Sequence, residues 1–225
     1  MMKTKEAKDI VGGLTYTSKM PCPSISIPSS ACITGAKLVK IKGSTCHGCY
    51  TFKGMYNFPA GKLARDKRLD SLYKLRWVEA MVTLIKSRRD YKKGEDWFRW
   101  HDSGDIQGMI HLCNIMQVAE LTPDCDHWLP TRENAFLKAY VESGKVVPSN
   151  MFVRVSATMI DGMPPTEFVN SLNKYDNVKG FIGTSTVHKN KEAIGVSCIA
   201  YDQGGECKDC RTCWSTELNV SYPKH

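Results

Sequence analysis

The 225-residue sequence lacks any long apolar run. No stretch approaches the roughly eighteen residues that a membrane-spanning helix needs, and the N-terminus MMKTKEAKDIVGG has no apolar core of a signal peptide. The chain also contains no internal repeat and no low-complexity segment, which excludes repeat architectures. We therefore expect a cytoplasmic globular protein without a membrane partner.

Acidic residues are fewer than basic ones, with 23 Asp and Glu against 31 Lys and Arg, a net charge of +8. Most of the excess lies between Ala60 and Lys93, where eleven basic residues stand against four acidic ones. A basic stretch attracts phosphates, although on a helix it is more often only the solvated face. Residues 60–93 therefore make nucleic acid a candidate partner.

Cysteine is abundant, with ten residues in a chain that has no export signal. Cytosolic thiols are kept reduced, so disulfides do not explain this number. Seven of the ten fall into two spaced groups, whereas Cys113, on an apolar helical segment, is expected in the core. Metal binding by thiolates is therefore the leading interpretation.

The C-terminal group comprises Cys198, Cys207, Cys210 and Cys213. Four thiolates close a tetrahedral zinc site or a four-iron cluster, and successive two-residue gaps let one loop supply three of them. The spacing does not distinguish zinc from iron, because four sulfur ligands suit both. The alternative is a set of unrelated buried thiols.

The N-terminal group is Cys32, Cys46 and Cys49, in a loop rich in Pro, Ser and Gly. Three ligands leave one position open, which a metal needs if it is also to bind a substrate or cofactor. Cys22 or His47 would close the site as a fourth ligand.

Strand and helix patterns alternate along most of the chain, which is typical of a parallel α/β sheet or a partial barrel. We expect residues 1–194 to form a partial (β/α) barrel and residues 195–225 to form a cysteine-rich C-terminal extension. Strands are expected at 14–18, 96–101, 127–130, 151–157 and 180–184, and helices after Pro59 and at 106–121, 133–142 and 165–172.

Ligand sites of α/β proteins lie beyond the carboxyl ends of the strands. His101 and Asp102 follow an expected strand and are candidates for catalysis, against the alternative of a structural hydrogen-bonded pair. Arg154 lies inside an apolar strand, where a buried guanidinium requires a partner, and it is the third candidate. Equivalent positions near other strand ends are occupied by Thr131, Arg132, Ser156 and His188.

A three-cysteine loop after a first strand, followed by Asp102-Ser103-Gly104-Asp105 after a second, resembles the radical S-adenosylmethionine superfamily. The resemblance implies a 4Fe-4S cluster on Cys32, Cys46 and Cys49. It also implies that Ser103, Gly104 and Asp105 lie near the amino group of the methionine in S-adenosylmethionine. The first cysteine gap is thirteen residues rather than the usual three, and Asp105 stands where Glu is common.

The segments TGAKL, CHGCY, RWHDSGDI, WLPTRE and NVSYPKH resemble the gene product 88 family of phages and plasmids over nearly the whole chain. A phage-encoded protein would act in the host cytoplasm. The four C-terminal cysteines then resemble an auxiliary iron–sulfur cluster, with zinc as the alternative.

The expected function is reductive cleavage of S-adenosylmethionine to act on an unknown substrate, with an electron donor as partner. The alternative from another class is a zinc-stabilised nucleic-acid-binding protein of phage or plasmid replication. A third interpretation is an iron–sulfur protein without radical chemistry.

Overall fold

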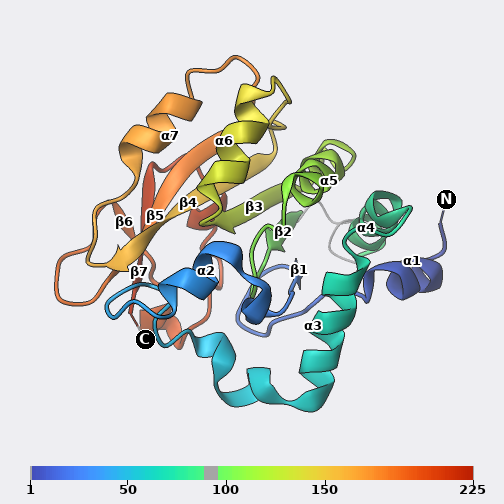
Figure 1. Cartoon of the computed structure of the whole chain (residues 1–225), viewed down its shortest axis with the longest axis horizontal. Coiled ribbons are helices and arrows are strands. Elements are labelled where there is room, and N and C mark those ends of the chain that lie inside the picture. Colours follow the sequence, from blue (N-terminus) through green and yellow to red (C-terminus); the bar gives the residue numbers. More distant parts are fainter. Residues whose placement is uncertain (1, 89–95, 225) are drawn as a thin grey trace.

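The computed structural model of the chain describes residues 2–88 and 96–224. Within these residues seven strands form one sheet in the order β1-β2-β3-β4-β5-β7-β6, and every neighbouring pair is parallel (Figure 1). The strands are β1 Ser24–Ile25, β2 Trp97–Trp100, β3 Asp126–Thr131, β4 Met151–Ile160, β5 Phe181–His188, β6 Val196–Ser197 and β7 Asn219–Pro223. The expected mixed α/β class with a parallel sheet is confirmed.

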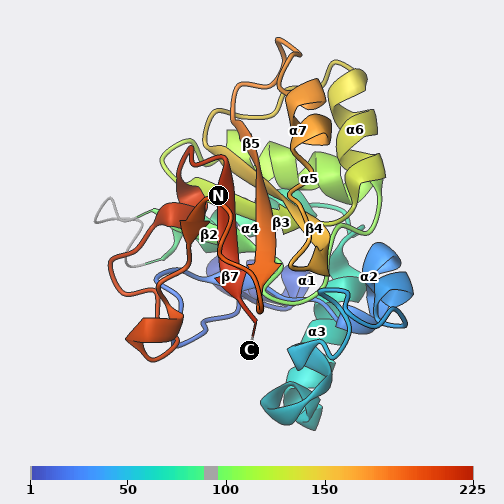
Figure 2. The same ribbon diagram turned by 90° about the vertical axis from the view of Figure 1, so that its left-hand side faces the viewer.

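The sheet is open, with β1 and β6 at its two edges, and it does not close into a barrel. Strands β1 to β5 lie side by side in chain order. Because parallel crossovers are right-handed, this order places the connecting helices on one face. Figure 2 shows α5, α6 and α7 on one side of the sheet and the C-terminal segment on the other.

The α-helices are α1 Thr4–Val11, α2 Ile33–Leu38, α3 Pro59–Ser71, α4 Trp77–Lys86, α5 Met109–Glu120, α6 Asn134–Glu142 and α7 Thr166–Leu172. Pro59 is the first residue of α3, where its missing N–H costs no hydrogen bond. The helical stretch expected after Pro59 is thus two helices, since Arg76 takes a left-handed φ of 66° between them.

The main core lies between the sheet and the helices. Phe98 and Trp100 of β2, Leu129 of β3 and Val153 of β4 are fully buried there. These residues alternate with Trp97, Arg99, Trp128 and Phe152, which lie on the other face of the sheet, hereafter the inner face. Since side chains of a strand alternate between faces, the two faces have different surroundings.

The first strand differs from expectation. Residues 14–18 contribute only an isolated bridge from Thr15 to Ser24, and β1 is Ser24–Ile25. Ser24, Ile25 and Ile27 are all buried, so a segment with only two apolar residues forms the strand. The run Ser-Ile-Ser-Ile does alternate polar and apolar residues, but it is only four residues long and lies between Pro23 and Pro28, which is too short for a strand pattern to stand out.

Residues 195–225 are not seen as a separate extension. They contain β6 and β7, and β7 pairs with β5 over five positions from Thr184–Asn219 to His188–Pro223. The intervening segment covers the inner face, where Trp214 donates its indole N–H to the carbonyl of Phe98 at 3.2 Å. A ring contact with Trp128 at 5.2 Å between centroids continues this packing. A continuous sheet therefore crosses the expected boundary at residue 194.

No helix among the described residues is long and apolar enough to cross a membrane.

Candidate metal centre at the carboxyl edge of the sheet

The loop that carries the N-terminal cysteines lies across the carboxyl ends of the central strands. The N–H of Thr45 donates to the carbonyl of Thr158 at 2.8 Å, and the N–H of Ile160 donates to the carbonyl of Gly43 at 2.9 Å. These bonds fix the residue before Cys46 to the end of β4. Parallel sheets place their ligand sites at this edge.

Two further contacts hold the same loop against β2 and β3. Both carboxylate oxygens of Glu133 accept hydrogen bonds from Thr34, from its N–H at 2.8 Å and from its hydroxyl at 2.9 Å. The hydroxyl of Tyr50 donates to the carbonyl of Asp102 at 2.7 Å. Thr34 and Tyr50 are close in sequence to Cys32 and Cys49, so the anchors position both ends of the cysteine loop.

The structure places the sulfurs of Cys32 and Cys46 near each other, and the charge of Cys49 also acts on Cys32. A Cβ placed on Gly35 would lie 3.6 Å from Sγ of Cys32 and 3.8 Å from Sγ of Cys46. Burial, together with the charges of Asp105, Cys46 and Cys49, raises the pKa of Cys32 to about 12. A metal would therefore have to displace protons from these thiols to bind them.

The surroundings of the three sulfurs favour an anionic metal–thiolate group. The Cys49 sulfur and the Thr51 hydroxyl are 3.0 Å apart. Burial raises the pKa of Cys46, and the positive charge of Arg132 opposes this rise. Hydrogen bonds to sulfur and nearby positive charge stabilise thiolates. The donor set thus fits a thiophilic metal, although no three His, Cys, Asp or Glu side chains within 2–88 and 96–224 already form a metal-holding group.

Asp105 lies beside this loop and joins the ends of β2 and β3. Its carboxylate accepts hydrogen bonds from the Thr131 hydroxyl at 2.7 Å, the Arg132 N–H at 2.9 Å and the Ile106 N–H at 2.8 Å. Burial raises the pKa of Asp105 to about 6. A carboxylate offers about four acceptor positions, so one remains for a further donor.

Ser103 and Gly104 shape the backbone at the end of β2. The hydroxyl of Ser103 donates to the carbonyl of Ile27 at 2.9 Å. Gly104 has a φ of +86°, and a Cβ there would lie 2.1 Å from Cγ1 of Ile27. The residue must therefore be glycine for both conformational and steric reasons.

His101 and Asp102 are buried but do not form a hydrogen-bonded pair. The ring of His101 lies 5.3 Å from that of His111 on α5, on the helix side of the sheet, and neither ring nitrogen has a hydrogen-bond partner. A φ of 56° at His101 turns the chain there. One carboxylate oxygen of Asp102 accepts the N–H of Ser103 at 3.1 Å. Of the two, only Asp102 contacts the cysteine loop, through its carbonyl.

The four C-terminal cysteines gather on the inner face. Burial raises the pKa of Cys207, and the charges of Cys198 and Cys210 raise it as well. The pKa of Cys213 is likewise raised by burial and by the charges of Cys198 and Cys207. Hydroxyl groups lie 3.3 Å from two of the sulfurs, Thr212 beside Cys210 and Tyr222 beside Cys213. Thr212 follows Cys210 by two residues, as Thr51 follows Cys49, so both sets have the same local pairing.

Two guanidinium groups accompany this second set. Arg99 stacks over Trp128 at 4.6 Å and Arg211 over Trp97 at 4.5 Å. Both lower the pKa of Cys207. Arg99 also donates to the sulfur of Met20 at 3.6 Å, while its Nε is buried without a partner. The positive charges of Arg99 and Arg211 suit a thiolate set that is negatively charged.

Arg154 anchors the C-terminal segment. Its guanidinium donates to the backbone carbonyls of Glu217, of Ser215 at 2.7 Å and of Thr212 at 3.2 Å. The absence of a side chain at Gly183 makes room, since a Cβ there would lie 2.7 Å from Nη1 of Arg154. The residue expected to grip a substrate is thus occupied by backbone acceptors.

Cys22 lies away from the N-terminal set, to which it was an alternative ligand. It packs with Trp128 and Trp214 on the inner face. Burial raises the pKa of its thiol to about 12, and the charge of the nearby Cys207 contributes to this rise. His47 lies on the cysteine loop with its Nδ1 at 3.1 Å from the carbonyl of Val39.

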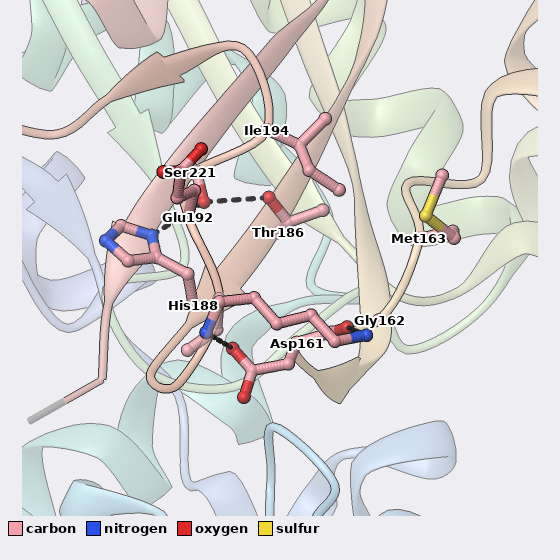
Figure 3. Close-up of a pocket in the computed structure, with 10 residues that line it drawn as sticks. Asp161, Gly162, Met163, Thr186, His188, Glu192, Ile194 and Ser221 are labelled. Carbon is pink, nitrogen blue, oxygen red and sulfur yellow. Dashed lines mark hydrogen bonds between the residues drawn. The ribbon is translucent and has the colours of Figure 1, made fainter.

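His188 lines a hollow of about 60 Å³ near the ends of β4, β5 and β7. Figure 3 shows His188 and Thr186 directed at Ser221, with Nδ1 of His188 at 2.8 Å from its hydroxyl and Thr186 at 3.0 Å. Ser156 lies elsewhere on the sheet, bonded to Ser185 at 3.1 Å. The hollow has room for a few water molecules.

Some of the basic residues of the stretch 60–93 make internal contacts. Arg68 is buried and donates to Ser26 at 2.7 Å, Arg76 pairs with Glu6 at 2.7 Å, and buried Arg88 donates to the carbonyl of Trp97 at 2.7 Å. Arg89, Lys92 and Lys93 fall outside the described residues. Lys62, Lys67, Lys74 and Lys86 are exposed, so the described basic residues of this stretch are divided between internal contacts and the solvent-exposed surface.

Thr34, Tyr50, Glu133 and Arg99 were not predicted from the sequence as site residues. Glu133 carried a readable signal, because it directly follows Thr131 and Arg132 at a strand end. The others are recognised only through contacts made across the fold.

These features define a parallel α/β protein with two cysteine sets, one at the carboxyl edge of the sheet and one on its inner face. The sequence model of the gene product 88 family matches residues 2–216, and the chain belongs to this family. No curated protein and no solved structure matches the chain.

Proposed function

We propose that this protein is an iron–sulfur enzyme of the radical S-adenosylmethionine type. The observation that carries the proposal is the meeting of Cys32, Cys46 and Cys49 with Asp105 at the carboxyl edge of a parallel sheet. Three thiols with no fourth cysteine beside them suit a cluster that keeps one iron available for a ligand.

In the proposed assignment Cys32, Cys46 and Cys49 hold a 4Fe-4S cluster. When bound, such a cluster supplies the electron that cleaves S-adenosylmethionine to methionine and a 5′-deoxyadenosyl radical, which removes a hydrogen atom from substrate. The electron comes from a donor protein or reductant.

The chain's own residues would bind and orient the cofactor. Asp105 has one free acceptor position for the ammonium group of the methionine moiety, next to its three internal bonds. The Thr51 hydroxyl at Cys49 would lower the electron density on that sulfur. Asp102 contributes through its carbonyl, which holds Tyr50 and hence the end of the cysteine loop.

The C-terminal cysteines would hold a second group that is closed by four protein ligands. Arg99 and Arg211 provide positive charge on this side, and Tyr222 and Thr212 provide hydroxyls to sulfur. An auxiliary 4Fe-4S cluster is proposed here, with zinc as the alternative.

The first experiment identifies the metals. Anaerobically purified protein should be brown and contain iron and acid-labile sulfide. Cys46→Ser should remove the N-terminal cluster and spare the C-terminal group, and Cys210→Ser should do the reverse. Stoichiometric zinc without iron would overturn the assignment and favour a zinc-stabilised protein.

The second experiment tests the reaction. Protein reduced with dithionite and supplied with S-adenosylmethionine should release 5′-deoxyadenosine and methionine. Asp105→Asn should weaken binding of S-adenosylmethionine while keeping the iron content. An intact pair of clusters that releases no 5′-deoxyadenosine would instead indicate an iron–sulfur protein without radical chemistry.

A further inference from the structure

The segment from Ile10 to Arg65 contains no Asp or Glu, although 23 acidic residues occur in the chain. It carries seven basic residues, Lys19, Lys37, Lys40, Lys42, Lys53, Lys62 and Arg65. This local excess is nearly as large as the net charge of +8 of the whole protein. The charge of this segment is therefore not neutralised from within.

Much of this segment projects from the body of the protein. α2, η2 (Tyr50–Phe52), η3 (Gly54–Asn57) and the start of α3 extend beyond the ends of the strands in Figures 1 and 2. Lys40, Lys42 and Lys53 are exposed there, and none of the ion pairs found among residues 2–88 and 96–224 involves them. Their ammonium groups are thus available to a ligand.

Large apolar side chains are exposed on the same projection. Tyr50, Phe52 and Phe58 are 56%, 47% and 59% exposed, and Ile41 and Leu63 are 47% and 57% exposed. Three of the five are aromatic, and lysines lie between them in sequence. Exposed rings alternating with positive charges are typical of surfaces that stack bases and track a phosphate backbone.

We infer that the projection formed by residues 33–63 binds single-stranded nucleic acid. The lysines would contact phosphates, and Phe52 and Phe58 would stack on bases. Duplex DNA fits less well, because its bases are already stacked and exposed rings have no access to their faces. The surface is distinct from the basic residues of α3 and α4 that serve internal contacts, and the inference holds with or without the proposed reaction.

Binding would be measured by fluorescence anisotropy with a labelled twenty-nucleotide oligo-dT, on metal-loaded full-length protein across a range of salt concentrations. A Lys40→Gln, Lys42→Gln, Lys53→Gln variant should reduce the slope of log affinity against log salt by about 2, since each lost phosphate contact removes roughly 0.7. Phe52→Ala with Phe58→Ala should weaken binding at least tenfold and leave the slope unchanged.

The matched control replaces Lys145, Lys174 and Lys179 with Gln. These exposed lysines precede β4 and β5 and therefore lie at the amino ends of the strands, opposite the carboxyl edge. Their replacement changes the net charge by the same amount. This variant should keep the wild-type slope. Iron content and unfolding midpoint of each variant would show that the cysteine loop is intact.

Three results would overturn the inference. Equal changes of the salt slope in the two lysine variants would mean that binding depends only on the net charge of the protein. Equal or tighter binding to a twenty-base-pair duplex would exclude base stacking. Absence of oligo-dT binding, together with lysine-dependent binding to vesicles of anionic phospholipid, would identify a membrane surface as the ligand instead.

Discussion

The carboxylate of Glu133 accepts two hydrogen bonds from Thr34, a residue ninety-nine positions earlier in the chain. Thr34 follows Cys32 by two residues, and Glu133 follows the end of β3. This bidentate contact is a direct tie between the cysteine loop and the sheet. It makes the position of the first thiol dependent on the structure of the β3–α6 connection.

Glu133→Ala should detach this end of the loop. We expect a loss of about 2 kcal/mol in the free energy of unfolding, because hydrogen bonds to a charged group are broken, and a lower metal content at the N-terminal set only. Urea unfolding and metal analysis would measure both. Glu142→Ala at the end of α6, the helix that follows Glu133, removes an exposed pair with Lys138 and should cost much less stability. Equal losses in both variants would contradict the role of Glu133.

Gly104→Ala should be strongly destabilising. The new Cβ meets Ile27 at 2.1 Å and the φ is +86°, so steric overlap of about 1–3 kcal/mol adds to about 1 kcal/mol of backbone strain. Gly144→Ala is the control, because Gly144 has a φ of +78° with no atom within 4 Å. The free energies of unfolding of the two variants, measured by chemical denaturation, should differ by at least about 1 kcal/mol. A smaller difference would refute the close packing of Ile27, which follows β1, against Gly104, which follows β2.

Arg154→Leu should loosen the C-terminal segment from the inner face. Three backbone carbonyls lose their shared donor, which we expect to cost about 3 kcal/mol. Cys210 and Cys213 should also react faster with a thiol reagent in metal-free protein. Arg76→Leu, which removes exposed pairs with Glu6 and Glu79, should cost much less stability than Arg154→Leu and leave the labelling rate unchanged. A labelling rate unaffected by Arg154→Leu would argue against the anchor.

Buried histidines should make the protein acid-sensitive. Burial lowers the pKa of His111 and of His127 to about 3, below the ordinary value near 6.5. The unfolded chain therefore binds more protons below pH 6.5, and stability falls as the pH decreases from 6.5 towards 3. Each histidine contributes about 1.4 kcal/mol per pH unit in that window.

Asp105 acts in the opposite direction, because its raised pKa of about 6 means that the folded protein gains a proton first as the pH falls. Urea midpoints between pH 7.5 and 5 should still decrease with acid. His127→Gln should reduce this dependence by about 1.4 kcal/mol per pH unit below pH 6.5. The same slope in the variant and the wild type would contradict a neutral buried His127.

The sheet was largely predictable because its strands are bounded by helical patterns. The strand expected at 151–157 lies within β4, and the helix expected at 133–142 matches α6 to one residue. β7 was not predicted, because NVSYP follows a cysteine-rich loop without the pattern of a βα unit. Its pairing with β5 depends on a partner more than thirty residues away.

Cysteine spacing predicts candidate ligands from the sequence, but it does not predict the residues that support them. Cysteine spacing identifies thiolates that one loop can present together, as Cys207, Cys210 and Cys213 illustrate. Spacing carries no information on Arg154, whose expected pocket is filled by the carbonyls of residues 212–217. Arg154 was expected to have a role in the site because a buried guanidinium needs a partner, and its partners are instead backbone carbonyls from the far end of the chain.

The sequence by itself determined the parallel α/β class and the division of seven cysteines into two sets, because periodicity and ligand spacing are local properties. Only the tertiary structure decided that one set lies at the carboxyl edge beside Asp105 and the other on the inner face beside Arg99. It also decided which basic residues stay exposed, since Arg68 and Arg88 are buried while Lys40 and Lys42 are not. Such differences arise from contacts between segments distant in sequence, and a local pattern does not encode them.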